Sequence, residues 1–153
     1  MCGIVGKICF NETIDALEIK NLCDRLISRG PDDEGIFVNN QVGLGHRRLS
    51  VIDLEMGIQP MRSEDGNCVI VFNGEIYNFL ELREELVKLG VNFSTQSDTE
   101  VILRSYQMYG INKTLNILEG MFAFVLYDIS TKNVYVARDK FGEKPLYYIK
   151  SDD

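Results

Sequence analysis

The apolar positions in the first third of the chain predict a strand, a helix and a hairpin. Residues 4–10 form a short run rich in β-forming residues and predict an inner strand. From residue 14 to residue 27, apolar side chains recur at roughly helical spacing, and Gly30, with a proline behind it, predicts the end of that helix. Two short apolar runs at 35–38 and 42–44 flank Asn-Asn-Gln and indicate a hairpin.

The middle of the chain predicts one buried strand followed by two helices. Residues 68–72 (CVIVF) form a continuous apolar run that delivers the next segment, NGEIYN, to one end of a sheet. Asn78 can cap the following helix, whose apolar stripe ends at a glycine. Ser97 and Glu100 have the spacing of a capping box at the start of a third helix, which we expect to close at Gly110.

The last third predicts a second hairpin, and the order of the elements predicts an α+β fold. MFAFVLYDI, the turn STKN and VYVARD indicate two well-formed strands, and LYYIK is the last segment with a legible pattern. Because most strand pairs are joined by tight turns, we expect antiparallel sheets with helices packed outside them rather than a Rossmann unit. No repeat or linker divides the chain, so we expect one domain over residues 1–153.

Composition and charge exclude several classes of protein. A chain of 153 residues with 45% hydrophobic and 25% charged residues has the composition of an ordinary globular domain. A formal net charge of -7 leaves no basic surplus for a nucleic-acid partner. No apolar run approaches the roughly 20 residues needed to cross a bilayer, and the start of the chain lacks a signal-peptide pattern. We therefore expect no membrane partner and a cytoplasmic location.

The cysteines do not form a metal-binding motif. Cys2, Cys9, Cys23 and Cys68 are scattered without a CxxC pair, and His46 is the only histidine. A zinc site needs paired ligands at short spacing, so we expect no metal site. Cys9, Cys23 and Cys68 are expected to be small apolar residues, and His46 a hydrogen-bonded structural residue.

The opening hexapeptide, MCGIVG, offers a chemical interpretation of Cys2. If Met1 is removed, Cys2 carries a thiol and a free α-amine on one residue. The nucleophile then brings its own base and needs no histidine. An ordinary cysteine at the start of a strand is the alternative, and the hexapeptide alone does not decide between the two.

Other polar residues lie where a core does not need them. Asn73 and Gly74 follow the buried strand and can donate to an oxyanion, although a plain strand-to-helix turn explains them too. The arginines of HRRLS can grip a carboxylate or can be solvated surface charges. Glu75 and Asp98 can accept from an ammonium group, and Asp98 also suits a helix cap. Together these groups match a carboxamide with an α-amino acid head, which is glutamine.

Seven segments resemble the glutaminase domain of glutamine-hydrolysing asparagine synthetase, a class II glutamine amidotransferase with the N-terminal-nucleophile fold. They are MCGIVG, RGPDDEG, GHRRLSVID, FNGEIYN, SDTEVIL, LEGMFAFVLYD and RDKFGEKPLYY. The resemblance covers essentially the whole chain. It implies an enzyme with an αββα sandwich, in which two stacked antiparallel sheets lie between helical layers. It also implies that residues 1–153 are a glutamine amidotransferase type-2 domain, shortened at its C-terminus because family members continue further.

By matching motif, the resemblance implies the catalytic residues. Cys2 is similar to the nucleophile that forms a γ-glutamyl thioester, and Asn73 and Gly74 correspond to the oxyanion hole. Arg29, in RGPDDEG, resembles part of a structural loop beside the nucleophile and is assigned no catalytic step.

The resemblance also implies the residues that bind the substrate. Arg48 matches the arginine that binds the glutamine α-carboxylate, and backbone groups of Leu49 and Val51 line the same loop. Glu75 and Asp98 match residues around the α-amine.

The ammonia acceptor and the partners stay open. Family members continue into an ATP-dependent synthetase domain, which we expect as a partner in cis or in trans. ATP and Mg²⁺ are expected there, and no cofactor is expected in this chain. Aspartate is the expected acceptor, and RDKFGEKPLYY suggests a sugar carboxylate of surface-polysaccharide synthesis as the alternative. A catalytically silent glutamine-binding subunit is a further alternative, and a homodimer is left open.

Overall fold

The computed structural model describes residues 1–49, 53 and 56–151. Its elements in chain order are β1 (Gly3–Ile8), α1 (Ala16–Asp24), β2 (Asp33–Asn39), β3 (Val42–Arg48), β4 (Met61–Arg62), β5 (Cys68–Ile76), α2 (Phe79–Lys88), α3 (Asp98–Ile117), β6 (Gly120–Asp128) and β7 (Asn133–Arg138).

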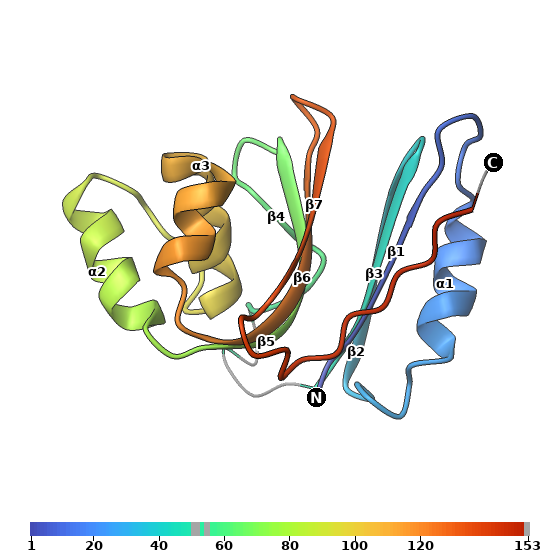
Figure 1. Ribbon diagram of the computed structural model, residues 1–153, viewed down its shortest axis with the longest axis horizontal. Helices are drawn as coiled ribbons and strands as arrows, with labels where there is room; N and C mark the ends of the chain where they lie inside the picture. Colours follow the sequence, from blue (N-terminus) through green and yellow to red (C-terminus); the bar gives the residue numbers. More distant parts are fainter. Residues whose placement is uncertain (50–52, 54–55, 152–153) are drawn as a thin grey trace.

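Two antiparallel sheets lie face to face. One has the strand order β1–β3–β2 and the other the order β4–β5–β6–β7. Figure 1 shows α1 on the outer face of the three-stranded sheet and α2 and α3 on the outer face of the four-stranded sheet. The layers follow the order helix, sheet, sheet, helix. The predicted α+β class and the αββα sandwich are therefore confirmed.

Side chains of β5 alternate between two layers of the core. Ile70 and Phe72 face α2 and α3, where Phe124 of β6 is also buried. Val69 and Val71 face the three-stranded sheet. Because successive residues of a strand point to opposite faces, a strand covered on both sides needs an unbroken apolar run. This requirement explains the CVIVF segment.

The predicted end of β5 is wrong, and the predicted cap of α2 is correct in position but lacks its side-chain hydrogen bond. β5 continues to Ile76, so the NGE segment lies within a paired strand. Asn78 precedes α2 but makes no capping hydrogen bond. Its carboxamide donates to the Ile117 carbonyl at 2.9 Å and accepts from the Glu119 N–H at 3.1 Å. The side chain therefore ties the end of α3 to the start of α2.

The predictions for α3 are correct at its start and incomplete further on. Ser97 caps the helix by accepting from the Thr99 N–H at 3.1 Å. Glu100 does not complete a capping box, because its carboxylate accepts from the N–H groups of residues 94 and 95 instead. Gly110 interrupts the helix with φ 75° and ψ 170°, but a second helical segment follows it.

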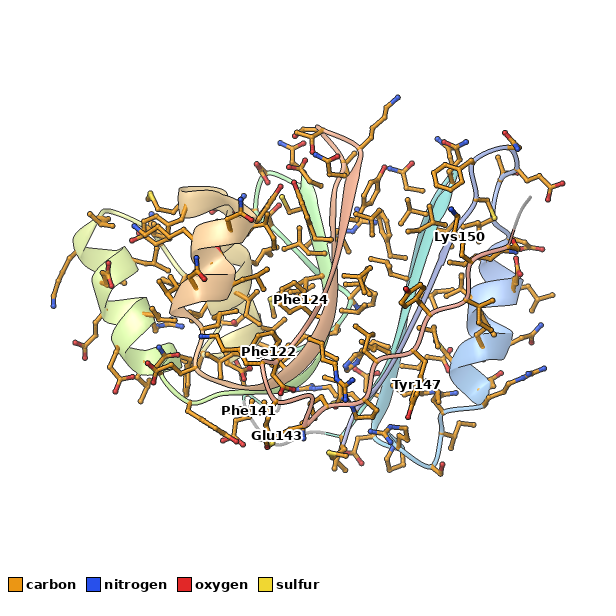
Figure 2. All side chains as sticks on the ribbon, viewed as in Figure 1. Phe122, Phe124, Phe141, Glu143, Tyr147 and Lys150 are labelled. Atoms are coloured by element: carbon orange, nitrogen blue, oxygen red, sulfur yellow. The ribbon has the colours of Figure 1, made fainter. Side chains whose placement is uncertain are left out.

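The C-terminal segment crosses from one sheet to the other. Residues 145–151 form no helix or strand. In Figure 1 the chain that follows β7 runs across to the three-stranded sheet, and Figure 2 labels Tyr147 and Lys150 along it. Tyr147 is 91% exposed, so the segment lies on the surface. Among the described residues, no helix combines the length and the apolar character needed to cross a membrane.

Candidate active site

Seven of the eight predicted site residues line one pocket of about 170 Å³. They are Cys2, Arg48, Leu49, Asn73, Gly74, Glu75 and Asp98. The eighth, Val51, lies outside the described residues. In Figure 1 the N-terminus lies at the lower end of the two sheets and between them. The fold thus brings the chain start, the end of β3, β5 and the start of α3 to one place.

The thiol of Cys2 lies against the backbone that leaves β3. Gly3 pairs with Arg47, which places residue 2 beside the end of that strand. The Leu49 N–H donates to Cys2 Sγ at 3.4 Å, and Sγ lies 3.6 Å from the Leu49 carbonyl oxygen. Arg29 Nε donates to the Cys2 carbonyl at 3.1 Å, so Arg29 lies beside Cys2 as predicted. These contacts hold both the thiol and the backbone of Cys2.

Alternate N–H groups of β5 point to its outer edge, away from β6. The Phe72 N–H donates to Gln59 Oε1 at 2.6 Å, and the Ile76 N–H donates to Asp98 Oδ2 at 3.1 Å. Gly74 lies midway between them and faces the same edge. Within the described part of the chain, the Gly74 N–H has no hydrogen-bond partner. It is therefore available to a ligand in the pocket.

Asn73 provides a second donor beside Gly74. Its side chain shares the face of β5 that Val69 and Val71 present to the three-stranded sheet. The residue is only 4% exposed. Counting the residues that the structure describes, its carboxamide has no hydrogen-bond partner. Both N–H groups of the amide are thus left for a ligand.

Gly74 is required by the close approach of β6. A Cβ atom at this position would lie 2.2 Å from the Met121 carbonyl oxygen and 2.7 Å from the Phe122 Cα atom. Only a residue without a side chain can fit there, and the pairing with Phe122 in β6 fixes the position of the Gly74 backbone.

Arg48 belongs to the pocket wall, whereas its neighbour Arg47 faces away. Arg48 is buried, and its guanidinium donates to the Asp53 carbonyl. The Asp53 carboxylate accepts from the Gln96 N–H at 2.7 Å, which links the end of β3 to the residues before α3. Arg47 instead forms ion pairs with carboxylates of α1 and β2. Arg48 is therefore the arginine that is placed to meet an anionic group.

Asp98 is a buried carboxylate at the first residue of α3, with 4% exposure. Burial raises its pKa to about 6, although the hydrogen bond from the Ile76 N–H favours the charged form. The group is ionised at pH 7 and can accept from a cation in the pocket. Glu75 is exposed and lines the same pocket.

Several residues of the pocket wall are not among the site residues predicted from the sequence motifs. They include Gln59, Ser97, Thr99, Met121 and Lys144. Lys144 is 6% exposed, and its Nζ donates to the sulfur of Met1 at 2.9 Å. RDKFGEKPLYY contains Lys144, so the motif was a signal for it. Nothing in the local pattern around Gln59 indicates a site.

His46 and the buried cysteines Cys23 and Cys68 lie outside the pocket lining. His46 is buried, and its Nε2 lies 3.1 Å from the Phe72 carbonyl oxygen. Burial lowers its pKa to about 4, so the ring is neutral at pH 7 and Nε2–H donates to that carbonyl. Burial also raises the pKa of the Cys23 and Cys68 thiols to about 11. All four cysteines are free. Across the described ranges, no group of three or more His, Cys, Asp or Glu side chains is placed to hold a metal.

Comparison with known proteins connects this geometry to a family. The family described as a glutamine amidotransferase domain matches residues 1–153. The chain belongs to this family. Asparagine synthetase [glutamine-hydrolyzing] 1 of Bacillus subtilis is 48% identical over 157 residues, a match that covers all of this chain and 25% of that protein. A probable asparagine synthetase of Schizosaccharomyces pombe is 44% identical over 155 residues, with 100% and 28% covered.

This glutamine amidotransferase domain therefore spans about a quarter of the length of the curated relatives it matches. A solved structure, the glutamine phosphoribosylpyrophosphate amidotransferase of B. subtilis complexed with ADP and GMP, is 26% identical with a TM-score of 0.55. The match covers 67% of this chain and 24% of that one. These similarities confirm the predicted resemblance and the N-terminal-nucleophile fold.

Asp98 generates a prediction about stability and pH. Its pKa is raised to about 6 from 3.8, so the folded state binds its proton more tightly than the unfolded state. The group therefore contributes stability below about pH 4 that is lost as the pH rises through 6. Asp98→Asn keeps an acceptor for the Ile76 N–H and removes the buried charge. We expect the variant to unfold with a free energy about 1–3 kcal/mol higher than the parent at pH 7, and with little difference at pH 4.

Urea denaturation at both pH values measures this effect. Asp15→Asn is the matched control, because Asp15 is an exposed carboxylate that caps α1 and asparagine caps equally well. We expect it to change stability by less than about 0.5 kcal/mol at either pH. An Asp98→Asn variant that is less stable than the parent at pH 7 would contradict the raised pKa of the buried Asp98 carboxylate.

Proposed function

We propose that this domain hydrolyses glutamine through Cys2 after Met1 has been removed. The observation that carries the proposal is the convergence of four groups in one pocket. The Cys2 thiol lies there with the Gly74 N–H, which has no partner among the described residues, the Arg48 guanidinium and the buried Asp98 carboxylate. These groups are a nucleophile, an oxyanion donor, an anion site and a cation site, and free glutamine presents one function to each of them.

The substrate's amino acid head is bound by charge. Arg48 donates to the α-carboxylate, because a guanidinium binds a carboxylate through two parallel hydrogen bonds. Asp98 is ionised at pH 7 and accepts from the α-ammonium, with exposed Glu75 adding negative charge at the same pocket. Binding the head at these two points leaves the side-chain carboxamide directed toward Cys2.

The bond-breaking step uses the two functions of Cys2. The thiol attacks the carboxamide carbon while the free α-amine takes its proton, and the Asn73 carboxamide and the Gly74 N–H donate to the resulting oxyanion. The protonated α-amine of Cys2 then gives its proton to the leaving nitrogen of the substrate. This nitrogen departs as ammonia and leaves a γ-glutamyl thioester on Cys2. Water attacks the thioester and releases glutamate and the free thiol.

We propose that the ammonia is consumed by an ATP-dependent synthetase domain that converts aspartate to asparagine. The names of the curated relatives and their greater length support this proposal. ATP and Mg²⁺ act in that domain, in cis or in trans, and the glutaminase step in this chain uses neither. A sugar carboxylate as acceptor finds no support among these relatives. The free cysteines suit a cytoplasmic location.

We expect glutaminase activity to require the removal of Met1. While Met1 is present it blocks the α-amine, and its side chain lies in the pocket beside Lys144. Cys2→Ala is expected to abolish glutamate release, and Cys2→Ser to be strongly impaired because a hydroxyl is a poorer nucleophile. Intact-mass spectrometry on the same samples as a glutaminase assay relates activity to processing.

Cys9→Ala is the matched control, because Cys9 is a half-buried cysteine away from the pocket lining. It is expected to keep the parent activity. Full activity in a sample that retains Met1 would refute the mechanism. Glutamine binding without turnover in a processed sample would identify a silent binding subunit instead.

Arg48→Lys tests how the carboxylate is bound. A point ammonium does not reproduce a bidentate grip, so kcat/KM for glutamine is expected to fall at least about tenfold, or roughly 1.4 kcal/mol. Arg47→Lys changes the adjacent arginine, whose ion pairs lie elsewhere, and is expected to stay within about twofold of the parent. Equal losses in both variants would point to a general folding effect and reject the specific role of Arg48.

The last expectation for this activity concerns the chain alone. Processed protein is incubated with glutamine, aspartate and Mg·ATP, and glutamate, asparagine and AMP are quantified. We expect glutamate at the same rate with and without ATP, and neither asparagine nor AMP, because all the groups assigned here serve amide hydrolysis. Asparagine or AMP formed by this chain would contradict the proposal that ATP-dependent amidation takes place in a separate domain.

A further inference from the structure

Gln59 is a buried pocket residue to which the glutamine chemistry described above assigns no step. The residue is 6% exposed. Its Oε1 accepts from the Phe72 N–H at 2.6 Å, and its Nε2 donates to Thr99 Oγ1 at 3.3 Å. A backbone N–H can only donate, so the contact with Phe72 determines which way the amide faces. Its nitrogen must then face Thr99.

The two partners of Gln59 belong to opposite sides of the glutamine site. Phe72 immediately precedes Asn73 on β5, and Thr99 immediately follows Asp98 on α3. One side chain therefore connects the segment that carries the oxyanion donors with the segment that carries the ammonium acceptor. Asp98 makes a second connection of the same kind through the Ile76 N–H. The open N–H of Gly74 lies between these two cross-links.

The Phe72 peptide needs this support because its neighbouring strand is short. β4 pairs with β5 only at Val69 and Ile70. Beyond Ile70 the outer edge of β5 has no strand beside it among the described residues. Gln59 accepts the Phe72 N–H at this edge, and the His46 Nε2–H donates to the Phe72 carbonyl. Two buried side chains thus replace the missing strand at the residue before the oxyanion donors.

The backbone of Gln59 is itself confined by the three-stranded sheet. A Cβ atom on Gly35 of β2 would lie only 2.0 Å from the Gln59 carbonyl oxygen and 2.8 Å from the Pro60 Cδ atom. Gly35 is also the partner of His46 in the ladder between β2 and β3. Gln59 therefore reaches β5 and α3 from a backbone that is packed tightly against the other sheet.

We propose that Gln59 is a positioning residue that holds the oxyanion donors of β5 at the correct place relative to Asp98 on α3. The inference rests on the proposed glutaminase function. Displacing catalytic groups by about 1 Å can cost about 100-fold in rate. Because the cross-link acts on groups that meet the developing oxyanion, its loss lowers kcat more than it weakens glutamine binding.

The test compares two amide-to-apolar substitutions in the processed protein. Gln59→Met keeps the length of the side chain and removes both hydrogen bonds. Asn78→Leu removes an equivalent amide bridge, between Ile117 and Glu119, that lies outside the pocket lining. Glutamate release gives kcat and KM, and thermal unfolding gives Tm for each variant.

We expect Gln59→Met to lower kcat about 10- to 100-fold, with KM within about threefold of the parent. Asn78→Leu is expected to lower Tm by a similar amount and to leave kcat within about twofold. This difference separates a positioning role from general destabilisation. Thr99→Val removes only the α3 end of the cross-link and is expected to lower kcat about three- to tenfold. If Gln59→Met does not fold, the kcat of Thr99→Val tests the positioning role instead.

The outcomes distinguish the inference from the proposed function. If the parent is active and a folded Gln59→Met variant has the same kcat, the positioning role of Gln59 is rejected and the proposed glutaminase function stands. A Thr99→Val variant that matches the parent rejects the positioning role when Gln59→Met does not fold, and so does an equal loss of kcat in Asn78→Leu. A processed parent that releases no glutamate overturns the proposed function, and this inference falls with it.

Discussion

The mismatch in length between β4 and β5 is the constraint on which the site depends. β5 runs from Cys68 to Ile76, but β4 pairs with it only at Val69 and Ile70. A buried strand edge must find partners for its N–H and carbonyl groups. Here those partners are side chains from three other segments. Side chains serve both polar groups of Phe72 and the Ile76 N–H. The Gly74 N–H lies between them and is the point where a ligand oxygen can bind.

The two titratable side chains that complete this edge respond to pH in opposite directions. Burial holds the pKa of His46 near 4, below its ordinary 6.5, so its contribution to stability is lost as the pH falls from about 6.5 to 4. Burial moves the pKa of Asp98 upward to about 6, so its contribution changes in the opposite sense over nearly the same range. The two groups therefore change the stability of the fold in opposite directions as the pH falls.

Most of the fold could be predicted because local patterns decided it. The hairpins follow from turn residues between alternating or apolar runs, and the motifs around Cys2, Arg48, Asn73 and Asp98 indicated the site. The errors concern element boundaries, at the end of β5 and beyond Gly110, and side chains for which a tertiary partner replaced a local one. Asn78 has the spacing of a cap, yet its amide serves residues 117 and 119 instead.

Gln59 shows why part of the site lay beyond prediction from the sequence. It is 13 residues from Phe72 and 40 from Thr99, so neither partner can be inferred from helical or strand periodicity. Its environment also depends on the close packing of Gly35 in the other sheet. A residue of this kind becomes visible only when the sheets and α3 are assembled.

The lack of space at Gly74 has a consequence for how this site can be dissected. Half of the oxyanion-binding group proposed for this domain is a main-chain N–H, and a methyl group added at its Cα atom would collide with the backbone of β6. An alanine scan would therefore record a packing defect at this position and would attribute nothing to chemistry. Its contribution is accessible only by altering the atom itself, for example by replacing the amide linkage with an ester in a semisynthetic chain.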